Sequence, residues 1–117
     1  MQRKATKQSR GANSDERRFM SWIKERSICA ACDQPAAVIN HHMYGSTAKV
    51  KVELITVCIG HTAVLGLCQC CDNIVTRGSR RKFVDQFGPQ NALWLKQYAD
   101  SPVRFPPMVV EGIRLYE

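Results

Sequence analysis

Two Cys-x2-Cys pairs constrain the fold of this chain more than any other feature of its sequence. The first pair is Cys29 and Cys32, and the second is Cys68 and Cys71. A tetrahedral zinc ion needs four ligands that converge on one point, and two tight turns that each supply two thiolates meet this requirement. The spacing therefore predicts a structural zinc site formed by these four cysteines.

A disulfide framework is the alternative use of the 6 cysteines. The N-terminus is basic and polar without the apolar segment of a signal peptide, and no apolar run is long enough to cross a membrane. We therefore expect a cytoplasmic protein with reduced thiols that are available to a metal. Of the remaining cysteines, Cys58 is expected at a buried strand position, and Cys70 competes with its neighbours for the ligand role.

The charge of the chain indicates a polyanionic partner. The sequence has 117 residues and a net charge of +7, which makes DNA or another nucleic acid the leading candidate. The clustered basic residues are Arg3, Lys4, Lys7, Arg10, Arg77, Arg80, Arg81 and Lys82. We expect them to bind nucleic acid, and a solvated basic surface is the alternative.

The chain divides into three parts. Residues 1–13 have the composition of a disordered basic arm, residues 14–101 form one zinc-containing domain, and residues 102–117 form a proline-containing tail. A hydrophobic core of this size is marginal on its own, so the zinc is expected to contribute to folding. The tail is expected to add an edge strand, dock on the core, or bind a partner.

Local patterns predict the secondary structure of the domain. Ser14 is expected to cap a helix with Phe19, Trp22 and Ile23 on its apolar face. Strands are expected over residues 36–43, 49–58 and 63–67, followed by helices after Cys71, over residues 79–87 and after Pro89. In the strand over residues 49–58, the side that is expected to face inward carries Val50, Val52 and Leu54. In the last helix, the residues expected inward are Ala92, Leu93 and Leu95, with Trp94 and Tyr98 as further candidates.

A histidine doublet, His41-His42, lies between the two cysteine pairs. Adjacent residues of a strand point to opposite sides, so one histidine can bind a metal while the other activates a water molecule. Phosphodiester hydrolysis needs a general base, a divalent cation and positive charge that holds the backbone. The candidates are His42 as base, and His41 with Asp72 as cation ligands. Alternatively, a histidine replaces a cysteine at the zinc, or both histidines cap a turn.

Four segments carry a family resemblance: Cys29–Cys32, Asn40–Gly45, His61–Cys68 and Cys68–Asp72. Together with the stretch Phe83–Gln90, they resemble the zinc-bearing branch of the HNH, or His-Me finger, endonucleases, and in particular small nucleases associated with phage and prophage recombination. The resemblance covers about residues 28–98. It implies an α+β fold with a small ββα-metal domain and flanking helices, in a protein encoded by a phage or prophage.

The resemblance also implies residue roles. His41 would bind the catalytic cation, His42 would be the general base, and His61 would orient the base. The family usually has a metal-binding histidine where this chain has Asp72, and a carboxylate suits a hard cation such as Mg²⁺ or Mn²⁺. Asn73 would supply a further oxygen ligand. The implied partners are DNA and a recombinase filament or a host DNA-repair protein. The alternative is a catalytically inactive zinc-stabilised module that binds nucleic acid or such a repair protein.

Overall fold

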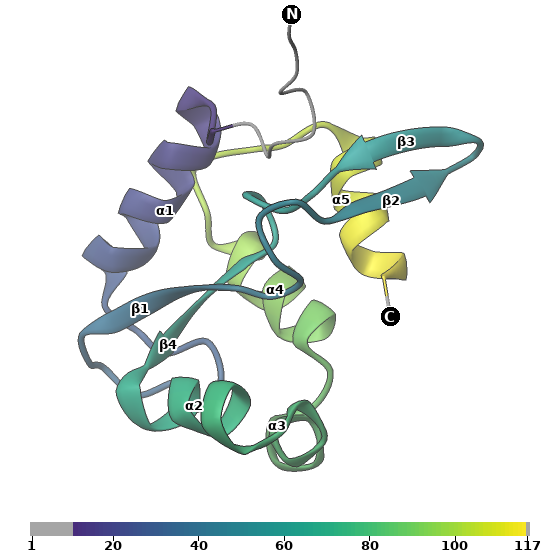
Figure 1. Cartoon of the computed structure of the whole chain (residues 1–117). Helices are drawn as coiled ribbons and strands as arrows, with labels where there is room; N and C mark the ends of the chain where they lie inside the picture. The colour runs from purple at the N-terminus through teal and green to yellow at the C-terminus, as the bar shows by residue number, and fades with distance from the viewer. Residues whose placement is uncertain (1–10, 117) are drawn as a thin grey trace, which may run out of the picture.

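The computed structural model describes residues 11–116 and has an α+β fold (Figure 1). Along the chain, the elements are α1 (Ser14–Arg26), β1 (Val38–His42), β2 (Lys49–Val52), β3 (Ile55–Cys58), β4 (Val64–Cys68), α2 (Gln69–Asn73), the π-helical turn η2 (Ile74–Gly78), α3 (Arg80–Phe87), α4 (Gln90–Ala99) and α5 (Pro107–Leu115). The expected α+β class is confirmed. The basic residues predicted in the arm, Arg3, Lys4, Lys7 and Arg10, lie outside the described residues. No helix within residues 11–116 combines the length and apolarity needed to cross a bilayer.

The N-cap of helix α1 lies one residue earlier than the sequence predicted. Ser14 was the expected cap, but Asn13 occupies that position: its side chain accepts a hydrogen bond from Glu16 N, and Glu16 Oε1 accepts one from Asn13 N. This reciprocal pair satisfies two backbone donors at the helix start. Phe19 and Ile23 are buried, as the helical spacing predicted.

Strands β1 and β4 form the sheet that leads to the predicted site. They run antiparallel, with Val38 opposite Cys68 at one end and His42 opposite Val64 at the other. Strand β4 continues directly into α2, because Cys68 is both its last residue and the N-cap of that helix. The two strands therefore carry the histidine doublet and the second cysteine pair on one structural unit.

Helices α1 and α4 hold β4 in the core. Gly66 allows the close approach of α1, because a Cβ atom there would lie 2.4 Å from Ile23 Cγ2. From α4, Gln97 accepts a hydrogen bond from Gly66 N (2.9 Å) and donates one to Val64 O (2.9 Å). The backbone of β4 is thus fixed by a buried side chain as well as by its partner strand.

The prediction of one strand over residues 49–58 is wrong. The segment forms the β2–β3 hairpin, which turns at Glu53 and Leu54, both with positive φ (50° and 73°). The alternation of Val50 and Val52 ends at this turn, so Leu54 is 92% exposed instead of facing inward. Cys58 was expected to be buried, but it ends β3 in an exposed position.

Helices α3 and α4 begin and end near the expected residues. Ser79 caps α3 by accepting a hydrogen bond from Lys82 N, and Gly88 ends it with φ 95°. The inward face of α4 differs from the prediction at Ala92, which is exposed, whereas Trp94 is fully buried. The other buried residues of α4 are Gln90, Gln97 and Tyr98. Two of these buried residues, Gln90 and Gln97, are polar. Their burial results from tertiary packing, which the spacing of apolar residues does not reveal.

The C-terminal segment docks on the core, which is one of the three expected arrangements. Helix α5 lies beside the β2–β3 hairpin (Figure 1). Its Ile113 is fully buried, and a Cβ atom on Gly112 would lie 2.6 Å from Val50 Cγ1 of β2. Beyond α5, the Tyr116 ring stacks on Tyr44 at 3.9 Å between centroids. The end of the chain therefore braces both the hairpin and the loop after β1.

Candidate functional site

The four cysteines of the two Cys-x2-Cys pairs converge on one point. Cys29 and Cys71 are buried, Cys32 and Cys68 are partly buried, and all four sulfur atoms lie within 4.8 Å of one another. A zinc ion with bonds of about 2.3 Å to four thiolates needs sulfur atoms about 3.8 Å apart. The Sγ atoms of Cys32 and Cys68 are 4.0 Å apart. The cluster is therefore compatible with a structural zinc ion, as the spacing predicted.

Local structure explains why these cysteines meet. Asp33 has a positive φ of 62° and donates its N–H to Cys29 O, which tightens the first turn. In the second pair, Cys68 and Cys71 are three positions apart at the start of α2, so they lie on one face of the helix. Cys70 is exposed and does not belong to the cluster.

The thiols of the cluster differ in acidity. Burial raises the pKa of Cys29, but the backbone amides of Cys32, Cys68 and Ala31 outweigh this effect and lower it to about 7. The pKa of Cys71 is raised by burial and by the thiols around it. Four thiolates at this separation repel one another, so a bound cation is needed to keep all four ionised.

A first pair of predicted site residues meets beside the cysteine cluster. His41 Nδ1, near the end of β1, lies 3.6 Å from Asp72 Oδ1 of α2. Both side chains are mostly buried, at 14% and 15% exposed. Asp72 directly follows Cys71, so the cluster that holds α2 also positions this carboxylate. The two atoms are close enough to share one cation after a small adjustment of either side chain.

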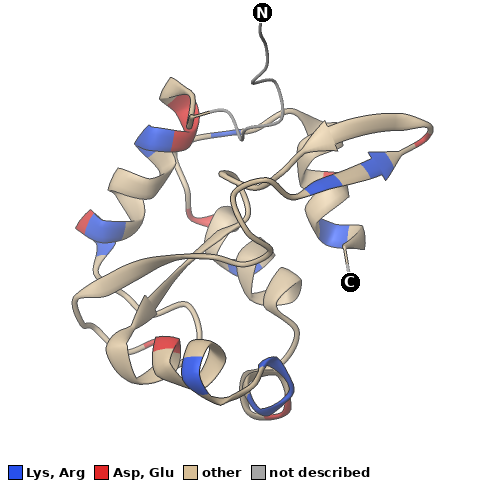
Figure 2. Ribbon diagram, viewed as in Figure 1, with Lys and Arg blue, Asp and Glu red and all other residues tan. Residues whose placement is uncertain are grey.

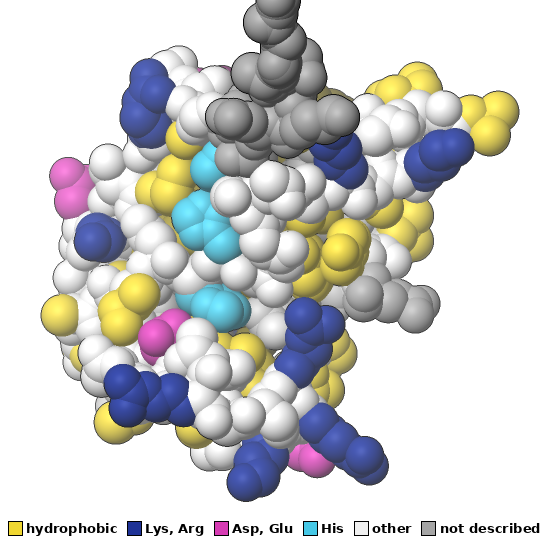
Figure 3. Space-filling model, viewed as in Figure 1, with side chains coloured by type: hydrophobic (Ala, Val, Ile, Leu, Met, Phe, Trp, Pro, Cys, Tyr) yellow, Lys and Arg dark blue, Asp and Glu magenta, His cyan; other side chains and the backbone are white. Residues whose placement is uncertain are grey.

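A second pair forms on the other side of β1. His42 Nε2 lies 3.3 Å from His61 Nδ1, and the two rings are nearly perpendicular at 83°. His61 belongs to the loop between β3 and β4, where Gly60 permits close packing, since a Cβ atom there would lie 2.1 Å from Ser46 O. The histidines lie on one face of the molecule, coloured cyan in Figure 3.

Both histidines of the doublet favour the neutral form. Burial lowers the pKa of His41, an effect that the carboxylate of Asp72 opposes and the charge of Arg80 reinforces. Burial also lowers the pKa of His42, together with the nearby rings of His61 and His41. Neutral imidazole is the form that binds a metal or accepts a proton.

Gln90 contacts this site although sequence reasoning did not name it. The residue is 5% exposed at the start of α4, and its carboxamide raises the pKa of His41. Within residues 11–116, however, neither Gln90 Oε1 nor His41 Nε2 has a hydrogen bond of regular geometry. The only sequence signal is a polar residue after Pro89, which is typical of any helix start.

The predicted basic cluster lies on the surface near the histidines. Arg77 lies in the last turn of η2, Arg80, Arg81 and Lys82 occupy the first turn of α3, and all four are exposed. Figure 2 shows the positions of the basic residues along the ribbon. Among residues 11–116, these four side chains form no ion pair. Arg80 lines a cavity of about 110 Å³ that also includes Tyr44 and Gln90. Positive charge is therefore available at the edge of the site.

Asn73, the predicted additional oxygen ligand, is engaged on the surface of α2. Its Oδ1 accepts a hydrogen bond from Gln69 Nε2 at 3.0 Å. Of the three predicted cation ligands, His41 and Asp72 lie close together, and Asn73 would have to give up its bond to Gln69 to join them.

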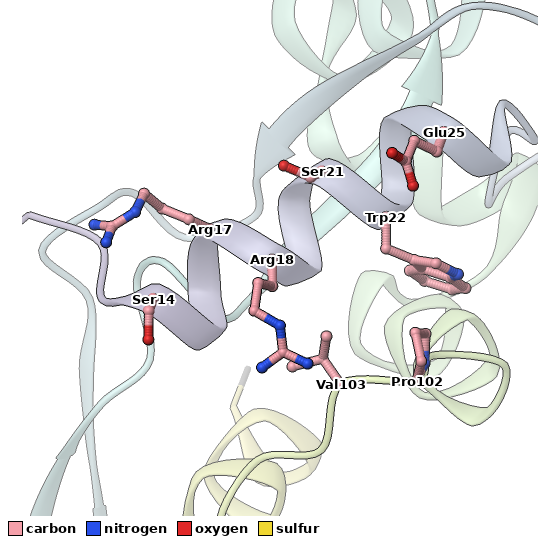
Figure 4. A pocket seen from close by; sticks show the side chains of 8 residues that line it. All are labelled: Ser14, Arg17, Arg18, Ser21, Trp22, Glu25, Pro102 and Val103. Carbon is pink, nitrogen blue, oxygen red and sulfur yellow. The ribbon is translucent and has the colours of Figure 1, made fainter.

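A larger groove lies elsewhere, along α1. It has a volume of about 630 Å³. Figure 4 shows Arg18 and Trp22 reaching toward Val103 and Pro102, while Arg17 points away from them. None of the predicted site residues lines this groove. Its titratable lining residues are Arg17, Arg18 and Glu25, with no histidine or cysteine among them.

No protein-family model, no curated protein and no solved structure matches the chain.

Proposed function

We propose that the protein is a metal-dependent DNA endonuclease of the HNH type that acts in phage or prophage recombination or repair. One observation carries the proposal: the His41–Asp72 pair at 3.6 Å and the His42–His61 pair at 3.3 Å form at the same end of β1. These residues come from three separate segments of the chain. Titratable side chains that gather from separate segments beside a carboxylate are typical of functional sites.

The order of the secondary structure supports the proposal. Strands β1 and β4 are antiparallel, and α2 follows β4 without a break, which is the strand–strand–helix order of a ββα-metal unit. The β2–β3 hairpin is inserted between the two strands. The cysteine cluster fastens the start of α2 to the first cysteine turn, so a bound zinc ion would stabilise the unit without taking part in hydrolysis.

His42 is the proposed general base. When His42 Nε2–H donates to His61 Nδ1, the lone pair of His42 lies on Nδ1 and can accept a proton from water. The resulting hydroxide attacks the phosphorus in line, the bond to the 3′ oxygen breaks, and solvent protonates the departing oxygen. The lowered pKa of His42, caused first by burial, keeps this base neutral near pH 7.

His41 and Asp72 are the proposed ligands of the catalytic cation. A carboxylate oxygen and an imidazole nitrogen fit Mg²⁺ or Mn²⁺, with water and phosphate oxygens completing the shell. When bound, such a cation stabilises the negative charge that develops on the 3′ oxygen. Asp72 replaces the histidine usual in the family, and its negative charge strengthens the attraction for a hard cation.

Arg80 and its neighbours are the proposed phosphate contacts. Arg80 lies near enough to His41 to lower its pKa, and Arg81 and Lys82 follow on the same helix. These side chains can neutralise backbone phosphates without reading bases. A host recombinase filament or DNA-repair protein would then determine which DNA is presented to the site.

Incubation of supercoiled plasmid with the zinc-loaded protein tests this function. We expect nicking with Mg²⁺ or Mn²⁺ and none without a divalent cation. The reaction should be repeated on DNA that carries a recombinase filament, because the proposed role is in recombination.

A catalytically inactive module is the second candidate. The net charge of +7 and the unpaired basic residues of α3 suit nucleic acid or an acidic repair protein whether or not the site is active. DNA binding with no nicking under any of the conditions above would favour this candidate.

A further inference from the structure

The β2–β3 hairpin projects from the body of the molecule (Figure 1). Apolar side chains lie at its tip. Leu54 is 92% exposed and Ile55 is 54% exposed, which makes Leu54 the most exposed large hydrophobic residue within residues 11–116. Single exposed apolar residues are common on protein surfaces. Leu54 and Ile55, however, are adjacent and lie at the tip of a projecting hairpin. Together they form a small apolar patch that is open to solvent.

The backbone conformation at the hairpin tip is unusual for the residues that occupy it. Glu53 and Leu54 both have positive φ, a conformation that two-residue hairpin turns normally assign to Asn or Gly. A side chain with a Cβ atom is disfavoured there, so folding stability does not explain the choice of a leucine. An external contact made by Leu54 would explain it.

The base of the hairpin is braced. Val52 is buried and Val50 is partly buried, and both pack on α5 around Gly112, where a Cβ atom would lie 2.6 Å from Val50 Cγ1. This contact ties the hairpin to the C-terminal helix. A rigid support is needed by any side chain that inserts into a partner, because a freely moving tip would lose more conformational entropy on binding.

The outer face of the hairpin is basic. Lys49 and Lys51 are exposed, and their cross-strand neighbours, Cys58 and Thr56, carry no charge. Neither lysine forms an ion pair within residues 11–116, and Glu53 is the only acidic residue of the hairpin. The basic residues on β2 are visible in Figure 2, and Figure 3 shows basic side chains on the hairpin on the same face as the histidines.

These features fit one partner, duplex DNA. Its phosphates complement the two lysines, and its stacked bases accept an apolar wedge, as happens in proteins that kink DNA from the minor groove. An apolar protein surface would match the leucine but would leave the lysines without a role. A second copy of the chain pairing along the hairpin would bring like charges together.

We propose that the β2–β3 hairpin is a DNA-deforming element, in which Lys49 and Lys51 contact phosphates and Leu54 inserts between base pairs of the duplex that lies across the face carrying the histidines. The inference rests on the DNA-binding part of the proposed function and not on cleavage. Kinked or unstacked DNA would present a distorted backbone to His42 and the proposed cation ligands. The element would therefore favour flexible or already distorted DNA over a uniform duplex.

The test uses the full-length zinc-loaded protein with His42→Ala, so that DNA is not cut. Leu54→Ala is compared with Leu115→Ala, a matched exposed leucine at the end of α5 that is 51% exposed. Binding is measured on a short duplex that carries 2-aminopurine, whose fluorescence rises when bases unstack. We expect Leu54→Ala to weaken binding about tenfold and to abolish the fluorescence change. Leu115→Ala should alter neither.

The lysines are tested by the salt dependence of binding. Replacing Lys49 and Lys51 by alanine should reduce the slope of log affinity against log salt by about 2, since each phosphate contact contributes about 0.9. Equal behaviour of Leu54→Ala and Leu115→Ala overturns the proposal, as does a Leu54→Ala effect on sedimentation but not on DNA binding. Nicking by the protein with intact His42 is measured separately. A negative result for DNA deformation by Leu54 can therefore be distinguished from a negative result for DNA cleavage.

Discussion

The Nδ1 atom of His41 lies 3.6 Å from Oδ1 of Asp72, the residue that directly follows the metal-cluster cysteine Cys71. The cysteine cluster and the histidine site are therefore linked through one turn of α2. A bound zinc ion would fix α2 against the first cysteine turn, and this position of α2 brings the carboxylate to His41. Loss of the zinc should consequently disturb the histidine site as well as the fold.

The first prediction concerns this cluster. Purified protein should contain about one zinc ion per chain, and Cys29→Ser should lower the free energy of unfolding on the order of 5 kcal/mol or more, because zinc binding contributes to folding. Elemental analysis and thermal unfolding measure both quantities. Cys70→Ser is the matched control, since Cys70 is exposed and outside the cluster. Folded protein without zinc, or an equal loss of zinc in both variants, would refute the assignment.

A second prediction concerns pH. His41 and His42 have pKa values lowered chiefly by burial, so both should titrate below the ordinary value of about 6.5. Below that pH the unfolded chain binds more protons than the folded chain. The stability that the two neutral histidines contribute should therefore be complete above pH 6.5. The free energy of unfolding should decrease as the pH falls from 6.5 toward the folded-state pKa values.

Nuclear magnetic resonance titration of the histidine rings in zinc-loaded protein measures these pKa values, with assignments from single His→Asn variants. The double variant His41→Asn and His42→Asn should lose this part of the pH dependence of unfolding. Ring pKa values at or above 6.5 for both residues would show that burial does not control their protonation.

The third prediction concerns Asp72, a proposed ligand of the catalytic cation. Asp72→Ala should reduce cleavage about 100-fold or more, because the cation loses a charged ligand. Asp72→His should restore part of the activity with Mn²⁺, Co²⁺ or Ni²⁺ but not with Mg²⁺, since imidazole favours softer ions. Asp85→Ala, on the exposed surface of α3, is the control. An unchanged metal preference in Asp72→His would place the cation elsewhere.

A fourth prediction concerns the basic cluster of α3. Replacement of Arg80, Arg81 and Lys82 by alanine should reduce the salt slope of DNA binding by about 3 and should weaken binding to all sequences alike. Lys96→Ala on α4 provides a comparison, since that lysine pairs with Asp33. If the triple variant keeps the full slope, the DNA path avoids α3.

The sequence predicted best what depends on short spacing. The two Cys-x2-Cys pairs predicted the cysteine cluster because each pair is fixed by a single turn. Ser79, Gly88 and Pro89 predicted the ends of α3 and the start of α4 through local preferences. His41, His42, His61 and Asp72 were named from the sequence, and the structure brings them together in two pairs. Their catalytic roles remain predictions.

What the sequence did not reveal depends on contacts between distant segments. The turn at Glu53 and Leu54 contains none of the residues that typically form such a turn. The sequence therefore predicts one strand where the structure has a hairpin. Cys58 is exposed because β3 ends there beside Lys49, and not because of its own polarity. Gln90 is buried only through the packing of α4 against the histidine site, which no periodicity encodes.

The general base tests the central claim most directly. Plasmid nicking should be measured for the wild type and for His42→Ala with Mg²⁺ and Mn²⁺, together with the zinc content and DNA affinity of each protein. A base acts on the nucleophile and contributes little to ground-state binding, so the account predicts a loss of nicking of about 10²- to 10⁴-fold with unchanged zinc and affinity. Equal rates for the two proteins, or no nicking by the wild type under any condition, would contradict it.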